Sequence, residues 1–268
     1  MREATRTSMT DPIGVVAPWP TARQELMLTA ALRPGAPALA AWGAWVSGLD
    51  PDRLEEQLEP DSQWLMPLLY WNLRRDVTHP VLARCRNVYL HNWYKNNAML
   101  HALASALRRE GTAADLPVLL KGAAMALRYY DTPGARPIET IDAWIPTAAA
   151  GVSPWADSLR ETLTLHAVPF ATTTTDGLLR RADTVTFMGA TCAVLGAADQ
   201  LLHICRHRGS WDSRTRLVWL ADAAQVLRRS PDFDWAAARA AARELGLDET
   251  LSATLEYLRR FDVPVPPR

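Results

Sequence analysis

The hydrophobic positions along the chain follow a helical period at both ends and a strand-like pattern in the middle. In the first part, apolar side chains recur at helical spacing in four segments, ARQELMLTAALR, APALAAWGAWVSGL, DSQWLMPLLYWNLRRD and the stretch from His79 to Arg109. Pro34 and Gly35 mark a break between the first two segments. The pattern predicts a helical N-terminal region over residues 21–113, with its tryptophans in the core.

The middle of the chain, residues 114–195, changes to short β-type runs. PVLL ends in Lys121-Gly122 and leads into AAMALRYY, which predicts a strand, a tight turn and a helix. RPIETIDAWIP alternates in the manner of a second strand. VPFATTTT and DTVTFMG are rich in β-branched residues, and CAVL is a candidate for a further short strand. We therefore expect a small sheet in this core.

The last part of the chain, residues 196–268, returns to the helical period. The helical segments are DQLLHICRHR, RTRLVWLADAAQVLRR, DWAAARAAARELG and ETLSATLEYLRRF. Residues 1–20 carry both charge signs and several prolines without an apolar run, which is typical of a flexible leader. The predicted fold class is α+β, with a small mixed sheet flanked by N-terminal and C-terminal helical regions.

Composition narrows the classes of function. Basic and acidic residues both total 29, so no basic excess favours a polynucleotide ligand. Cys85, Cys192 and Cys205 are odd in number and far apart, which favours free thiols in a reducing cytoplasm over a disulfide framework. No run of apolar residues is long enough for a membrane span, and we expect a soluble, cytoplasmic protein.

Two short segments of the core could carry chemistry. Lys121-Gly122, at the junction of a strand and a helix, would place backbone N–H groups and a mobile cation beside a phosphate. Taken alone, the pair is weak evidence, and a glycine needed for the turn beside a solvated lysine is the favoured interpretation. Thr140 and Asp142 stand two apart on the second strand and share one face. Asp142 lies among apolar neighbours, so it is either satisfied by local donors or part of a site.

These segments together resemble a known family. LPVLLKGAAMALRYYDTPGARPIETIDAWIP is similar to the core of the uncharacterised nucleotidyltransferase family, within the DNA polymerase β-like superfamily, whose pattern runs Leu-Lys-Gly, Tyr-Tyr, Arg-Pro and Asp-Ile-Asp. The C-terminal helices and the tryptophan-rich N-terminal helices also fit that family. The resemblance covers most of the chain, and the joint order of its motifs is what makes it specific.

The resemblance implies a mechanism and a set of residues. Paired strand carboxylates would hold Mg²⁺, the metal would bridge the triphosphate, and a nucleotide would be transferred to an acceptor as pyrophosphate leaves. Asp142 matches the second carboxylate, and Lys121, Gly122 and Arg136 match positions beside the nucleotide. Thr140 departs from the first carboxylate.

Because Thr140 is not a carboxylate, the implied metal site needs its other ligands from elsewhere in the chain. A neutral threonine hydroxyl is a poor ligand for a hard divalent cation. Glu139 would point to the opposite face of a regular strand and could reach the metal only through a bulge. Asp176 is the nearest candidate for the third carboxylate, and Asp183 is the next.

Other residue clusters give weaker indications. His203 and His207 stand at i and i+4 and could bind zinc, but Cys205 points elsewhere, and histidines packed against the sheet are the favoured interpretation. Asp222 is a candidate partner for His207. A basic cluster in the same region could meet a triphosphate or an acidic partner, or form a solvated face; it comprises Arg206, Arg208, Arg214 and Arg216.

Two functions from different classes follow from these observations. The first is transfer of a nucleotide monophosphate from a nucleoside triphosphate to a small-molecule or peptide acceptor, with a degenerate metal site. The second is a catalytically silent relative that keeps the fold as a binding or scaffold protein for a partner protein in a biosynthetic pathway. A third interpretation is an inactivated variant of a protein that has Asp at position 140.

Overall fold

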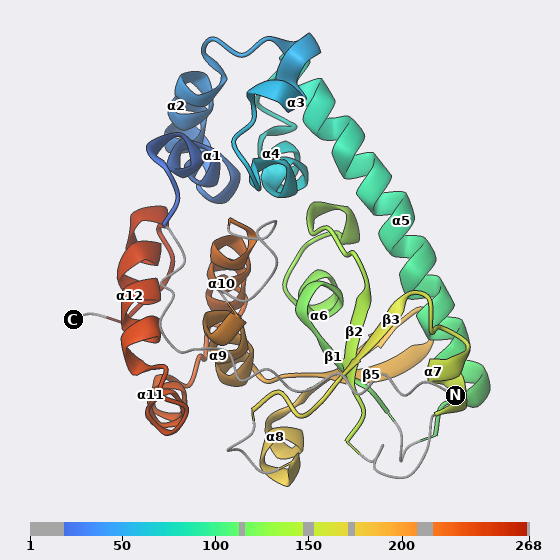
Figure 1. Ribbon diagram of the computed structural model, residues 1–268. Coiled ribbons are helices and arrows are strands. Elements are labelled where there is room, and N and C mark those ends of the chain that lie inside the picture. Colours follow the sequence, from blue (N-terminus) through green and yellow to red (C-terminus); the bar gives the residue numbers. More distant parts are fainter. Residues whose placement is uncertain (1–18, 113–115, 147–152, 171–174, 208–216, 267–268) are drawn as a thin grey trace, which may run out of the picture.

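The computed structural model describes residues 19–112, 116–146, 153–170, 175–207 and 217–266. The N-terminal part is helical, and its longest helix, α5, runs along one edge of the molecule from the other N-terminal helices down to the sheet (Figure 1). The capping box of Thr21 and Gln24 closes the start of the first helix. The helices are α1 (Ala22–Leu32), α2 (Gly35–Val46), α3 (Leu54–Gln57), α4 (Met66–Leu73) and α5 (Pro80–Glu110).

The middle of the chain forms a five-stranded mixed sheet with the strand order β3-β2-β1-β5-β4. β1 pairs with β2 antiparallel and with β5 parallel, β2 pairs with β3 parallel, and β4 pairs with β5 antiparallel. The elements are β1 (Val118–Leu120), α6 (Lys121–Arg128), β2 (Ile141–Trp144), α7 (Pro154–Asp157), β3 (Leu163–His166), α8 (Thr175–Arg181), β4 (Asp183–Phe187) and β5 (Ala190–Val194).

Four helices complete the chain and lie on the side of the molecule away from α5 (Figure 1). They are α9 (Ala197–His207), α10 (Val218–Arg228), α11 (Trp235–Glu244) and α12 (Asp248–Leu258). Short 3₁₀ turns lie at Pro51–Arg53, Ser62–Leu65, Pro133–Ala135 and Arg259–Phe261. No helix in the part of the chain that the structure describes is long and apolar enough to cross a membrane.

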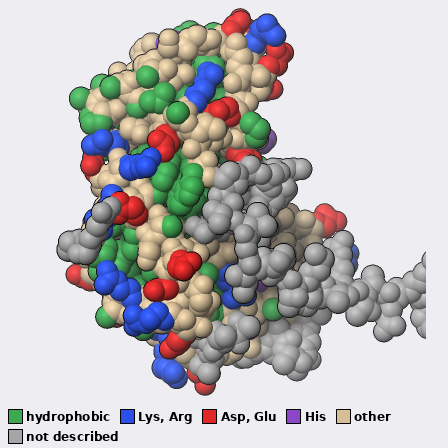
Figure 2. Space-filling model, turned by 60° about the vertical axis from the view of Figure 1, so that its left-hand side comes forward, with side chains coloured by type: hydrophobic (Ala, Val, Ile, Leu, Met, Phe, Trp, Pro, Cys, Tyr) green, Lys and Arg blue, Asp and Glu red, His purple; other side chains and the backbone are tan. Residues whose placement is uncertain are grey.

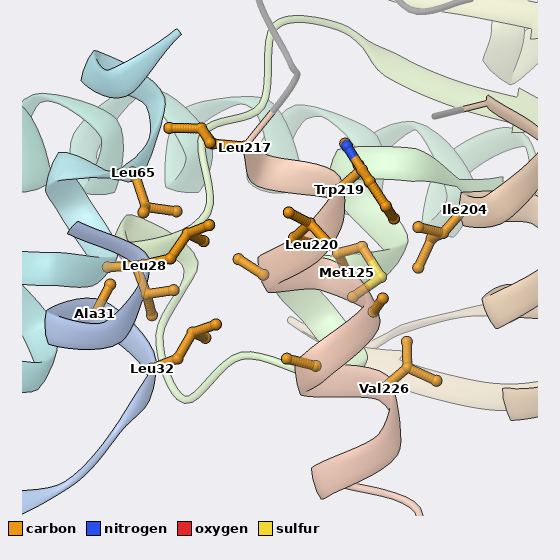
Figure 3. Close-up of a cluster of buried hydrophobic side chains, with 14 of the residues drawn as sticks. Leu28, Ala31, Leu32, Leu65, Met125, Ile204, Leu217, Trp219, Leu220 and Val226 are labelled. Atoms are coloured by element: carbon orange, nitrogen blue, oxygen red, sulfur yellow. The ribbon is translucent and has the colours of Figure 1, made fainter. Parts of the chain in front are cut away.

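Two clusters of buried side chains hold these elements together. The larger cluster joins the N-terminal helices, the β1–α6 unit and the C-terminal helices, and Figure 3 shows Leu28 and Leu32 of α1 and Leu220 of α10 among its side chains. The smaller cluster lies between α5, α6, α7 and the sheet, around the fully buried Trp155. Because the larger cluster draws on all three parts of the chain, the helical regions and the sheet share one hydrophobic core.

The fold class is α+β with helical flanks, as the pattern of the sequence predicts. One strand lies elsewhere than expected. Residues 168–170 of VPFATTTT are not in a strand, residues 171–174 fall outside the described part, and Thr175 begins α8. The strand is β3, directly before this segment; Pro169 cannot donate a hydrogen bond to a strand ladder, which is consistent with the strand ending earlier.

The expected leader falls almost entirely outside the described residues, since the description begins at Trp19. The Trp19 ring stacks on Tyr257 of α12, with 4.6 Å between the ring centroids. This contact joins the start of the described chain to its last helix.

Candidate functional site

The turn from β1 into α6 is the first component of the site. Lys121 begins the helix with φ of +50°, in the left-handed region that a lysine seldom adopts. Leu120, the residue before it, provides no side-chain cap for the first N–H groups of α6. A Cβ on Gly122 would lie 3.3 Å from the carbonyl oxygen of Pro137, so the close approach of that segment favours glycine.

Asp142 of β2 lies at the centre of the site. It is paired in register with Leu120, directly before the turn, and only 7% of its surface is exposed. Its Oδ1 lies 2.9 Å from Lys121 Nζ and 2.5 Å from His166 Nε2. Thr140 Oγ1 lies 3.4 Å from Oδ2 and donates to it. The sequence left two interpretations of Asp142 open, hydrogen bonding to local donors or membership of a site. These contacts show that local donors are present.

The electrostatics of this arrangement favour a charged Asp142. Burial alone would raise the pKa of its carboxyl group, but the hydrogen bond from His166 and the charge of Lys121 lower the pKa below the usual value. The carboxylate therefore already has a cation and a hydrogen-bonding imidazole on the same oxygen.

β3 supplies a residue that sequence reasoning missed. His166 ends this strand, and Thr164 is in register with Asp142 across the β2–β3 ladder. Residues 163–166, Leu-Thr-Leu-His, alternate apolar and polar side chains, and this short alternation is the only indication that could have revealed the strand. The strand beside Asp142 thus carries a threonine and a histidine, and no carboxylate.

One face of α9 lies within electrostatic reach of the same group. Gln200, His203 and His207 fall within about 60° of one another around the helix axis, and the rings of the two histidines are 4.6 Å apart. Burial lowers the pKa of His203 well below its usual value and that of His207 to about 4. The charges of Lys121 and His166 act in the same direction. Both imidazoles on α9 are therefore neutral near pH 7.

The depressed pKa of His207 predicts a loss of stability in mild acid. Between pH 6.5, the usual histidine pKa, and about pH 4, His207 binds a proton in the unfolded chain but not in the folded protein. The free energy of unfolding should decrease over this window, by up to about 1.4 kcal/mol per pH unit for one such group. Urea unfolding at several pH values measures the slope. It should become shallower in His207→Gln, with the contribution of His203 remaining, and should be unchanged in His101→Gln, a change on the exposed face of α5. An unchanged slope in His207→Gln would exclude His207 as its source.

Arg136 lies in a buried network away from solvent. Its Nε and the second guanidinium nitrogen contact the two carboxylate oxygens of Asp222 on α10, at 2.8 and 2.9 Å. Tyr130 donates its hydroxyl to the same carboxylate at 2.8 Å. Burial would lower the pKa of Arg136, but the charge of Asp222 raises it. This arrangement favours a structural role for Arg136 over a phosphate contact, and it gives Asp222 partners other than the expected His207.

The remaining candidate acids lie outside β2. Glu139 is exposed just before β2, and Asp176 is exposed in the first turn of α8. Asp183 begins β4, three strands or about 14 Å across the sheet from β2, and its carboxylate lies 3.5 Å from Arg128. Sequence order alone could not show this separation.

The residues at Asp142 do not fit a divalent metal ion. Within the described residues, no group of three or more His, Cys, Asp or Glu side chains could hold a metal. Mg²⁺ needs several oxygen ligands in near-octahedral geometry, whereas Asp142 offers one carboxylate that already contacts an ammonium ion. The same finding applies to zinc at His203 and His207, and Cys205 of that helix lies buried with its Sγ 3.7 Å from Thr254 Oγ1. Three members of the basic cluster, Arg208, Arg214 and Arg216, lie outside the described residues.

Comparison with known proteins supports the resemblance. Residues 158–261 match the family described as uncharacterised nucleotidyltransferase. The matched region begins after β2, so it contains His166, both α9 histidines and Asp222, but not Lys121 or Asp142. No curated protein and no solved structure matches the chain. The chain is therefore nucleotidyltransferase-like over β3 and the helices that follow.

Proposed function

We propose that this protein binds a nucleoside triphosphate where β1 ends and that it acts as a catalytically silent binding or scaffold protein rather than as a metal-dependent transferase. The observation that carries this proposal is the state of Asp142. Its Oδ1 contacts Lys121 and His166, and the nearby Thr140, just before β2, and Thr164, on β3, are neutral. Among the described residues, a nucleotide transfer that depends on paired carboxylates and Mg²⁺ does not find its ligands.

Several features support a nucleotide as the ligand. The family match is to nucleotidyltransferases, whose substrates are nucleoside triphosphates. Lys121 places a positive charge beside Asp142 at the end of β1, and an ammonium group with three donors is a common phosphate ligand. The start of α6 adds backbone N–H groups and the positive end of a helix dipole.

The surface charge supports a small ligand over a polynucleotide. The chain has equal numbers of acidic and basic residues. On the face drawn in Figure 2, acidic side chains lie among the basic ones, and apolar side chains separate them. Binding to a nucleic acid backbone depends on a concentrated basic surface, which this face does not present.

Thermal unfolding with added nucleotide tests the binding proposal. A nucleotide present at a hundred times its dissociation constant should stabilise the protein by about 2.7 kcal/mol, which is a rise of several degrees in Tm. Lys121→Met should abolish most of the rise. Lys95→Met is the matched control, because Lys95 and Lys121 are the only lysines in the sequence and Lys95 is exposed on α5. No rise with ATP, GTP, CTP or UTP would overturn the proposal.

The alternative is an active enzyme that moves a nucleotide monophosphate onto a small-molecule or peptide acceptor, and the family match favours it. Exposed Glu139 or Asp176 would then have to join Asp142 around Mg²⁺. Pyrophosphate release separates the two functions. We expect no release above background with Mg²⁺, any of the four nucleotides and candidate acceptors, whereas turnover that Asp142→Asn abolishes would establish the enzyme. A catalytically silent protein would instead act through a partner protein in a biosynthetic pathway.

A further inference from the structure

The position that a divalent ion would need at Asp142 already holds a positive charge. Lys121 Nζ lies 2.9 Å from Oδ1, and the Lys121 side chain is only 24% exposed. The backbone fixes this placement, because Lys121 follows directly on the β1 residue that is in register with Asp142. The ammonium ion is therefore built into the site by the turn between β1 and α6.

Within the described part of the chain, the side chains around Asp142 include no second carboxylate that would attract a divalent ion away from water. Thr140 directly precedes β2 and donates to Asp142, Thr164 lies opposite Asp142 on β3, and His166 contacts the same carboxylate oxygen as Lys121. Hard cations such as Mg²⁺ select charged oxygen ligands. A single carboxylate that is already neutralised is a poor competitor for such an ion.

We propose that the Lys121 ammonium ion takes the place of the divalent cation on Asp142, so that two features together exclude Mg²⁺: the missing carboxylate at position 140 and Lys121 itself. The inference depends on the proposed function only for the identity of the ligand, a nucleotide whose phosphates would then bind without a metal ion. Exclusion of the metal is a property of the protein alone.

This inference predicts that restoring the carboxylate does not by itself restore a metal site. Position 140 directly precedes β2, and the Thr140 hydroxyl already reaches Asp142. An aspartate there would therefore lie beside Asp142 and near the same ammonium ion. Lys121 would neutralise part of the new negative charge and would repel a divalent cation at close range. A metal site should appear only when the carboxylate is restored and the lysine is removed in the same protein.

Binding of Mn²⁺, used as a paramagnetic probe in place of Mg²⁺, tests this in the full-length protein without nucleotide. The loss of the free-ion electron paramagnetic resonance signal gives the dissociation constant for the wild type, Thr140→Asp, Lys121→Met/Thr140→Asp and Lys95→Met/Thr140→Asp. We expect the Lys121 double variant to bind Mn²⁺ at least about tenfold more tightly than Thr140→Asp. The Lys95 double variant, which loses an equal charge on the exposed surface of α5, should behave as Thr140→Asp.

Two results would overturn the inference. One is binding of Mn²⁺ by the wild type that Asp142→Asn abolishes, and this result does not depend on how any double variant folds. The other is a Lys121 double variant that retains the wild-type circular dichroism spectrum and melting behaviour yet gains no affinity. Should that variant not fold, Lys121→Gln/Thr140→Asp and the wild-type measurement decide the question.

A nucleotide titration separates this inference from the proposed function. Calorimetry with ATP in EDTA and in excess Mg²⁺ should give dissociation constants within about threefold of one another. Binding that requires Mg²⁺ contradicts the inference and leaves nucleotide binding intact. Absence of binding under both conditions contradicts the proposed function, while the Mn²⁺ measurement still tests the role of Lys121.

Discussion

Replacing Asp222 by asparagine is expected to lower the free energy of unfolding by about 3–5 kcal/mol. Asp222 is fully buried, and it holds Arg136, itself 5% exposed, through both carboxylate oxygens. Asparagine keeps the shape and removes the charge, so the guanidinium ion stays buried without its counter-ion. Tyr130 also loses the charged acceptor of its hydroxyl group. Urea unfolding followed by circular dichroism measures the loss.

Two further variants show whether the charge pair is the cause. Asp52→Asn breaks an exposed pair with Arg84, in which the two charged groups are 2.9 Å apart, and should cost less than about 1 kcal/mol. Replacing both buried partners, as Arg136→Met/Asp222→Leu, should recover a large part of the stability, because neither side chain then leaves an unpaired charge. Equal losses for Asp222→Asn and Asp52→Asn would contradict a special role for the buried pair.

The Arg136–Asp222 pair is a contact that local sequence patterns do not predict. Arg136 belongs to the Arg-Pro motif beside β2, while Asp222 lies 86 residues later on α10. Their spacing in the sequence does not predict the contact, because the contact depends on how α10 packs against the core. The same is true of Tyr130, from the Tyr-Tyr motif, which contacts the same carboxylate. Motifs that resemble a nucleotide site therefore include residues that hold the fold together.

Long periodic segments were the most predictable part of the fold. The apolar period from His79 to Arg109 predicts a helix, and α5 spans Pro80–Glu110. The strand, turn and helix around Lys121 were also predictable, because a short apolar run ends in Lys-Gly before a helical pattern. β3 was missed because four residues give little periodicity, and the threonines that suggested a strand lie after it, where Thr175 begins α8.

For the candidate site, the sequence identified the residues but not their relationships. Lys121 was expected to face a nucleotide and Asp142 a metal ion. In the structure, Lys121 Nζ lies 2.9 Å from Asp142 Oδ1. The register of β1 and β2 determines this contact, and the sequence of either strand alone does not contain it. His166 became part of the site only through the parallel pairing of β3 with β2.

Leu220→Ala is expected to destabilise the whole chain by about 2–5 kcal/mol. Leu220 is fully buried and lies in the larger cluster, which Figure 3 shows with Leu28 and Leu32 of α1 among its members. Truncation leaves a cavity at the contact between the N-terminal and C-terminal helices. Leu39→Ala, at a leucine of α2 with 38% of its surface exposed, is the matched control and should cost less than about 1 kcal/mol.

The same experiment tests whether the helical regions and the sheet unfold as one unit. The larger cluster contains Leu28 of α1, Leu120 of β1 and Leu220 of α10, so loss of any one part exposes apolar surface on the others. Urea transitions followed by circular dichroism and by tryptophan fluorescence should therefore coincide in the wild type and shift together in Leu220→Ala. If the two probes separate, and only one transition moves, residues 21–113 form a folding unit of their own. A single shared transition would mean that a ligand at Lys121 stabilises the N-terminal helices as much as the sheet that binds it.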